Sequence, residues 1–100
     1  MENFNEIIAS EQLTLVDFFA TWCGPCKMMQ PVLEQLKAEM GDRLRIIKID
    51  VDKNEAVSNA YRIQSVPTLM LFRSGQSLWR QSGALAKNEL KRIVEQQLEN

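Results

Sequence analysis

Two cysteines, Cys23 and Cys26, lie with two residues between them at the junction between an apolar run and an amphipathic run. The first run, residues 13–20, is rich in β-branched and aromatic side chains, which is typical of a strand buried on both faces. In the second run, residues 26–40, apolar side chains recur at helical spacing. The sequence therefore predicts a buried strand that turns through the two cysteines into a helix.

The rest of the chain alternates further helices and strands. Helices are predicted at residues 3–10, 54–61 and 87–98, and strands at residues 44–50, 68–73 and 77–82. Strand–helix–strand units favour parallel pairing through right-handed crossovers, and the final hairpin adds an antiparallel edge. We expect a single α/β domain over residues 1–100, with a mixed central sheet flanked by helices on both faces.

Composition and charge limit the classes of function. The 100 residues are 45% hydrophobic with a net charge of −1, so nothing in the bulk electrostatics favours nucleic acid or an anionic membrane surface as a partner. The apolar runs are too short to span a bilayer. The sequence contains no histidine, which excludes imidazole catalysis and histidine metal ligands. The first residues show no secretory signal pattern, so we expect a cytoplasmic location.

The close spacing of the cysteines leaves three interpretations. A disulfide across so short a loop adds little chain-entropy stabilisation. Zinc needs four ligands, which only a dimeric four-cysteine site would supply. Redox chemistry suits the spacing, because free N–H groups and the positive dipole end of the helix would stabilise a Cys23 thiolate, the attacking species. Gly24 and Pro25 form the turn, proline being tolerated at a helix start, and Cys26 lies one helical turn further on.

The hexapeptide Trp22-Cys23-Gly24-Pro25-Cys26-Lys27 resembles the active-site motif of the thioredoxin family. Further segments resemble the same family, at residues 16–18, 49–52, 65–68, 72–75 and 82–85. The resemblance implies the thioredoxin fold and a protein-disulfide reductase, a thiol–disulfide oxidoreductase in which Cys23 attacks the substrate and Cys26 resolves the mixed disulfide. It also implies that the chain binds no cofactor beyond its redox-active disulfide. NADPH and flavin would belong to a partner, thioredoxin reductase, which renews the dithiol.

Two charged residues lie in apolar strands behind the motif. The resemblance implies that Asp17 is a buried acid that accepts the Cys26 proton, and desolvation would raise its pKa. The alternative is a strand-edge carboxylate that reaches solvent. Lys48 would tune the pKa of Asp17, or it would be a charge at a strand end whose stem is buried while its ammonium reaches water.

The resemblance further implies a substrate-docking surface formed by Trp22, Val66, Pro67, Gly83 and Ala84. A trans peptide is the ordinary expectation for Val66–Pro67, whereas the family implies a cis peptide beside the cysteines. The backbone of Val66 could then pair with an extended substrate segment as an added strand.

Other large apolar residues are interpreted as core packing. These are Trp79 and the methionines Met28, Met29, Met40 and Met70. Pro31, inside the predicted helix, is expected to bend it.

The chain departs from the family pattern at three places. The family's first strand is predicted to be missing, which would leave residues 44–50 as an exposed sheet edge, partly protected by Arg45 and Lys48. We expect a monomer, with a dimer through that edge as the alternative. Phe19 replaces a usual tryptophan, and Ala86 replaces a frequent capping serine, a loss that typically costs about 1 kcal/mol.

Two other functions remain open on the sequence. One is an oxidase or isomerase of an oxidising compartment, although Gly24-Pro25 resembles the reducing members of the family. The other is a redox-switched binding module, in which turnover is incidental. A reduction potential separates the first alternative from a reductase, and a turnover assay separates the second.

Overall fold

A computed structural model describes residues 2–99 of the chain. Four strands form one mixed sheet in the order β2-β1-β3-β4. They are β1 (Thr14–Phe19), β2 (Arg45–Asp50), β3 (Thr68–Arg73) and β4 (Gln76–Ser82). β1 pairs parallel with β2 and antiparallel with β3, and β4 pairs antiparallel with β3. The predicted mixed sheet is confirmed, and in the described part of the chain β2 is an edge strand and no strand precedes the first helix.

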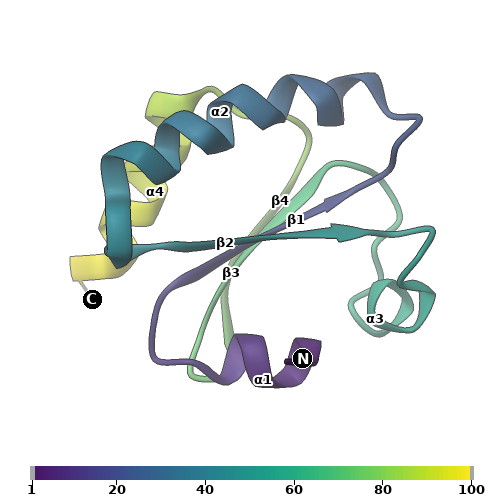
Figure 1. The fold of residues 1–100 in the computed structure, drawn as a ribbon, viewed down its shortest axis with the longest axis horizontal. Coiled ribbons are helices and arrows are strands. Elements are labelled where there is room, and N and C mark those ends of the chain that lie inside the picture. The colour runs from purple at the N-terminus through teal and green to yellow at the C-terminus, as the bar shows by residue number, and fades with distance from the viewer. Residues whose placement is uncertain (1, 100) are drawn as a thin grey trace.

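Helices cover both faces of the sheet, as the sequence predicts (Figure 1). α2 (Gly24–Met40) and α4 (Lys87–Glu99) lie on one face, and α1 (Phe4–Ala9) and α3 (Glu55–Ala60) lie on the other, with the short 3₁₀ turn η1 (Gly41–Arg43) after α2. α2 begins at Gly24, two residues before the predicted start, because the side chain of Cys23 caps its first turn. Among the described residues, no helix combines the length and the apolar character needed to cross a membrane.

The pleat of β1 decides which side chains reach which face, because successive strand residues point to opposite sides. Leu15 belongs to an aliphatic cluster with the inward side chains of α2 and α4. Val16 and Phe18 belong to the cluster on the opposite face, under α1 and α3. Asp17 follows Leu15 by two positions, so the pleat directs its carboxyl toward α2.

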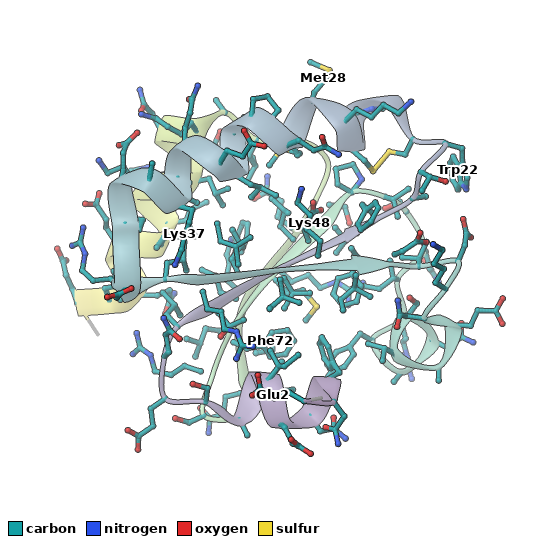
Figure 2. All side chains as sticks on the ribbon, in the orientation of Figure 1. Glu2, Trp22, Met28, Lys37, Lys48 and Phe72 are labelled. Carbon is teal, nitrogen blue, oxygen red and sulfur yellow. A yellow bond between two sulfur atoms is a disulfide. The ribbon has the colours of Figure 1, made fainter. Side chains whose placement is uncertain are left out.

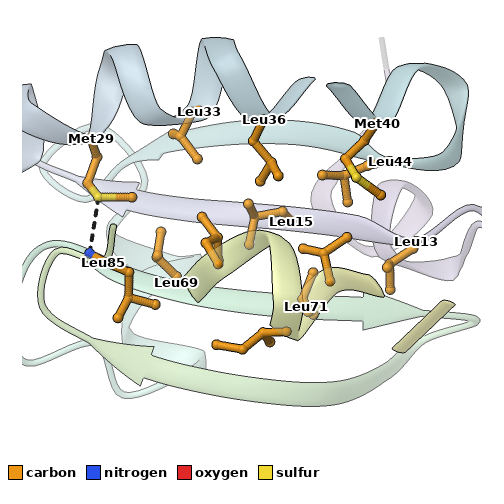
Figure 3. Close-up of a cluster of buried hydrophobic side chains, with 13 residues drawn as sticks. Leu13, Leu15, Met29, Leu33, Leu36, Met40, Leu44, Leu69, Leu71 and Leu85 are labelled. Atoms are coloured by element: carbon orange, nitrogen blue, oxygen red, sulfur yellow. Dashed lines mark hydrogen bonds between the residues drawn. The ribbon is translucent and has the colours of Figure 1, made fainter. Parts of the chain in front are cut away.

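The aliphatic cluster fixes α2 on the sheet (Figure 3). The side chains that α2 contributes recur three or four residues apart, at Met29, Leu33, Leu36 and Met40. The loop after β4 is held to the same helix, because the N–H of Leu85 donates a hydrogen bond to Sδ of Met29 at 3.4 Å. Helical periodicity therefore predicted this interface, and the Met29 contact also positions the loop that carries Gly83.

Two core interpretations have different outcomes. Trp79 on β4 packs against the aliphatic cluster, which confirms the interpretation. Met28 is 69% exposed, so its assignment to the core is wrong. It adjoins the inward Met29 and projects from the outer side of α2, as Figure 2 shows. The helix continues through Pro31.

The opposite face of the sheet is packed with aromatic rings. Phe4, Phe18, Tyr61 and Phe72 meet there with ring centroids 5.4 to 6.5 Å apart, in tilted or edge-on arrangements that suit their quadrupoles. This cluster packs between the sheet and the helices α1 and α3, whereas the cysteines and Asp17 lie on the face that α2 covers.

Candidate active site

The two cysteines lie where β1 ends and α2 begins, and a disulfide joins them (Figure 2). Cys23 precedes the helix with an extended backbone, φ −91° and ψ 115°. Its Sγ accepts a hydrogen bond from the backbone N–H of Cys26 at 3.1 Å. The sulfur of Cys23 thus takes the place of a capping oxygen at the positive end of the helix dipole, where negative charge is stabilised.

Gly24 and Pro25 fill the first helical positions between the cysteines, and both are exposed. Pro25 loses nothing by lacking an N–H, because first-turn N–H groups have no partner within the helix. A Cβ at Gly24 would meet no atom within 4 Å, so the surface beside the disulfide is open. Cys23 and Cys26 themselves are only 5% and 4% exposed, so in the oxidised state exposure does not rank the two sulfurs.

Asp17 lies behind the disulfide with only 2% of its surface exposed, so the alternative of a solvent-reaching carboxylate is wrong. Burial raises the pKa of Asp17 to about 6, and the positive charge of Lys48 opposes that rise. Within residues 2–99, Oδ1 of Asp17 has no hydrogen-bond partner. A carboxyl group in this state gains and loses its proton near neutral pH, which suits general acid–base chemistry.

Lys48 stands opposite Asp17 in the register of the β1–β2 pair. The two side chains line the same cavity, and Lys48 is exposed to solvent. In Figure 2 its side chain points from β2 toward α2. Lys48 therefore lies within the strand rather than at its end, and its charge lowers the pKa of Asp17 against the effect of burial.

A cavity of about 250 Å³ lies between the N-terminal part of α2 and the ends of β1 and β2. Its lining residues are Asp17, Phe19, Ala20, Thr21, Cys26, Lys27, Gln30 and Lys48. It is large enough for several water molecules, and it joins Cys26 to Asp17. Sequence reasoning missed the part played by Thr21, Lys27 and Gln30. Only helical spacing could have indicated Gln30, which lies four residues after Cys26 on the same side of α2.

The loop before β3 approaches the disulfide from another side. The carbonyl oxygen of Val66 lies 3.6 Å from Sγ of Cys23. The Val66–Pro67 peptide is cis, as the resemblance implies. The N–H of Gly83 donates to the carbonyl oxygen of Pro67 at 2.8 Å, which brings the loop after β4 beside the loop before β3. Ala84 follows in that loop and is exposed.

Trp22 is 71% exposed, and its Nε1–H donates to Oδ2 of Asp52 at 2.9 Å. The indole and Val66 line a hollow of about 140 Å³, completed by Val51, Ile63, Gln64 and Ser65. An exposed indole held beside a small hollow suits contact with an apolar side chain of a partner. Sequence reasoning gave Asp52 no role, although residues 49–52 were among the segments that resemble the family.

Of the residues that depart from the family pattern, Phe19 lies beside the disulfide and Ala86 lies before α4. Phe19 packs against the cluster formed by Ala20, Cys23 and Cys26. Ala86 precedes α4 and provides only its carbonyl oxygen, which accepts the N–H of Leu90 at 3.1 Å. Among residues 2–99, no group of three or more acidic, cysteine or histidine side chains is arranged to hold a metal ion.

A disulfide at the start of a helix, sharing a cavity with a carboxyl group that titrates near neutral pH, is typical of a thiol–disulfide oxidoreductase. The family model described as thioredoxin matches residues 1–96. The chain therefore belongs to the thioredoxin family, with Cys23–Cys26 as its redox-active disulfide. Through this pair it carries out dithiol–disulfide exchange and reduces the disulfides of proteins.

Individual relatives agree with the family match. The chain is 46% identical over 89 residues to thioredoxin of Bacillus subtilis, covering 89% of this chain and 86% of the relative. It is 41% identical over 98 residues to the chloroplastic thioredoxin Y of Oryza sativa, covering 97% of this chain and 58% of that longer relative. A solved structure of Plasmodium falciparum thioredoxin superposes with a TM-score of 0.84 at 36% identity, covering 93% of this chain and 89% of that one.

Proposed function

We propose that Cys23 is the nucleophile of this reductase and Cys26 the resolving thiol. The observation that carries the assignment is the hydrogen bond from the N–H of Cys26 to Sγ of Cys23, 3.1 Å long, at the start of α2. It stabilises a thiolate on Cys23 and none on Cys26, whose sulfur lies inside the first turn.

The reaction proceeds in two exchanges. The Cys23 thiolate attacks one sulfur of the substrate disulfide, the substrate S–S bond breaks, and the other substrate sulfur leaves as a thiolate. Cys26, once deprotonated, then attacks Sγ of Cys23, and the second substrate sulfur leaves. The substrate gains two electrons, and the chain is left with its Cys23–Cys26 disulfide.

Asp17 serves as the proton acceptor for Cys26 in the second exchange. Three features support this role: the shared cavity, the burial of Asp17 and a pKa of about 6. Lys48 tunes that pKa by opposing the effect of burial. Gly24 and Pro25 shape the turn that places the Cα atoms of the two cysteines 5.3 Å apart, close enough for the disulfide.

The substrate-docking surface consists of Trp22, Val66, Pro67, Gly83 and Ala84. Its support is the short approach of Val66 to Cys23 and the hydrogen bond between Gly83 and Pro67. An extended substrate segment would pair with the Val66 backbone while an apolar side chain contacts the indole of Trp22.

Each turnover consumes two electrons, so an electron donor must renew the dithiol. We assign this step to thioredoxin reductase, with NADPH and flavin on that partner. The predicted compartment is the cytoplasm, where thiols are kept reduced.

We propose a single domain that works as a monomer. Arg45, which is ion-paired with Glu2 at 2.7 Å, and the exposed Lys48 place charged side chains along the edge strand β2, and charged edge residues disfavour edge-to-edge pairing. Analytical ultracentrifugation tests this, and a concentration-dependent dimer would contradict it.

The test combines trapping, turnover and a potential. With a disulfide protein such as insulin, Cys26→Ser should accumulate a mixed disulfide at Cys23, whereas Cys23→Ser should form none. A reductase should show a Cys23–Cys26 potential more negative than about −200 mV. Mixed disulfides on Cys26 would overturn the role assignment. A less negative potential would favour an oxidase or isomerase, and partner binding without turnover would favour a binding module.

A further inference from the structure

Gln30 occupies a position in the cavity that the reaction scheme above leaves without a role. It lies one helical turn after Cys26 and lines the cavity that joins Cys26 to Asp17. Cys26 and Asp17 are buried at 4% and 2% exposure, whereas Gln30 is exposed. Gln30 therefore lines the cavity and is also open to solvent, which places it where the cavity opens to the surface.

The chemistry of the lining residues singles out this amide. Lys27 and Lys48 only donate hydrogen bonds, whereas a glutamine amide both donates and accepts them and stays neutral at every pH. Thr21 also donates and accepts, but it lies in the turn between β1 and α2. Gln30 comes from the regular part of α2, which the aliphatic cluster holds on the sheet.

The proposed reaction requires proton traffic through this space. When Cys26 attacks Cys23, the thiol proton passes to the Asp17 carboxylate. Asp17 can accept that proton only after it has released its own proton to solvent, and it must release the accepted proton in the same way before the next cycle. Its neighbour across the pair with β3 is Leu69, which provides no proton path, whereas the cavity connects Asp17 to the polar side chains of Thr21, Lys27, Gln30 and Lys48.

We propose that Gln30 is a positioning residue for proton exchange between Asp17 and solvent, its amide ordering water at the mouth of the cavity. This inference rests on the proposed role of Asp17. The charged and titratable groups that share the cavity with Asp17 are Lys27 and Cys26 from α2 and Lys48 from β2. A charge placed at position 30 would act on the pKa of Asp17 together with the charges of these groups.

The chain offers a matched control in Gln35. It is exposed on the same helix, five residues further on, and is not among the residues that line the cavity. The variants are Gln30→Leu, Gln30→Glu and Gln30→Lys, each paired with the same change at Gln35. Circular dichroism and thermal unfolding show whether each variant keeps the fold.

The readout is single-turnover reduction of a disulfide substrate between pH 5 and 9, with attack and resolution followed separately. Gln30→Leu should slow resolution severalfold and leave attack unchanged, a part of the roughly 10²- to 10⁴-fold that positioned proton transfer contributes. Gln30→Glu should raise the midpoint of the pH profile of resolution, and Gln30→Lys should lower it, each by about half a pH unit at low salt. The Gln35 variants should match the wild type.

Asp17→Asn separates failure of this inference from failure of the proposed function. If Asp17→Asn flattens the profile but the Gln30 variants behave like the Gln35 variants, the role of Gln30 is overturned and that of Asp17 stands. If Asp17→Asn leaves the profile of resolution unchanged, both roles are overturned. A loss of attack rate in Gln30→Leu equal to the loss of resolution would also overturn the inference, because it would indicate a general structural effect.

Discussion

The space between β1 and α2 has two ends that differ sharply. At one end Leu15 meets Leu36, both with 0% exposure, within a continuous aliphatic cluster. At the other end Asp17 and Cys26 face a cavity of about 250 Å³. Both ends lie on the same face of the sheet and under the same helix.

The difference teaches where this fold separates stability from chemistry. Leu15 and Asp17 are two residues apart on β1, so the strand directs both side chains to the same face of the sheet. Close packing at the Leu15 end excludes water and holds α2 in place. The open packing at the Asp17 end leaves a carboxyl group desolvated yet within reach of a proton path. Packing near the C-terminal end of α2 holds the helix on the sheet, and the disulfide lies at its N-terminal end.

The largest expected effect comes from weakening the packed end. Leu36→Ala removes a fully buried side chain and should lower the free energy of unfolding by about 2–5 kcal/mol. It should leave the reduction potential of Cys23–Cys26 unchanged, because the disulfide lies at the other end of α2. Urea unfolding and a glutathione redox titration check the two expectations.

Met28→Ala is the matched control for this change, since Met28 is 69% exposed on the same helix. Its effect on stability should stay within about 0.5 kcal/mol. A shift in potential in Leu36→Ala as large as that of an active-site variant would show that the two ends are not separable.

An intermediate effect is expected from the open end, and it depends on pH. The pKa of Asp17 is raised from 3.8 to about 6, so folding favours the neutral carboxyl. That stabilisation is complete below pH 3.8 and is lost as the pH rises through about 6. At pH 8 the buried carboxylate should therefore cost about 3 kcal/mol, which Asp17→Asn should recover.

Urea unfolding of the oxidised protein at pH 3.5 and pH 8 checks this expectation. The wild type and Asp17→Asn should be equally stable at the lower pH, with the variant more stable at the higher. Equal stability at both values would mean that Asp17 is solvated, and the contrast between the two ends would weaken.

The smallest expected effect lies on the surface of the packed end. Glu39 on α2 accepts hydrogen bonds from Lys87 and Lys91 of α4 at 2.6 and 2.7 Å, which lower its pKa from 4.5 to about 2. The contribution of Glu39 is therefore present above pH 4.5 and lost as the pH falls toward 2. Glu39→Gln should lower Tm by no more than a few degrees at pH 7, since exposed ion pairs contribute little.

The Tm difference should shrink in high salt, which screens such pairs. Glu11→Gln, the same charge change at an exposed position before β1, should show no comparable drop in Tm. A changed rate of disulfide reduction in Glu39→Gln would indicate that α4 acts on the disulfide end as well.

Much of the fold followed from local patterns. The apolar run of β1, the helical spacing from Met29 to Met40 and the turn motif at the cysteines each encode an element through neighbouring residues. The burial of Asp17 and the cis Val66–Pro67 peptide were expected from the family resemblance. The outward position of Met28 was missed because it adjoins Met29 and shares its apolar character.

By itself, the sequence determined the order of strands and helices, the redox pair and the class of chemistry, because periodicity and motif act over a few residues. The tertiary structure placed the Val66 carbonyl beside Cys23, as the resemblance had implied, and it alone decided that Asp52 holds Trp22 and that Gln30 shares a cavity with Asp17. The first two contacts join segments 43 and 30 residues apart in the chain. Such contacts depend on strand register and on how α2 settles on the sheet, and these are set by the packing of the whole core rather than by any local pattern.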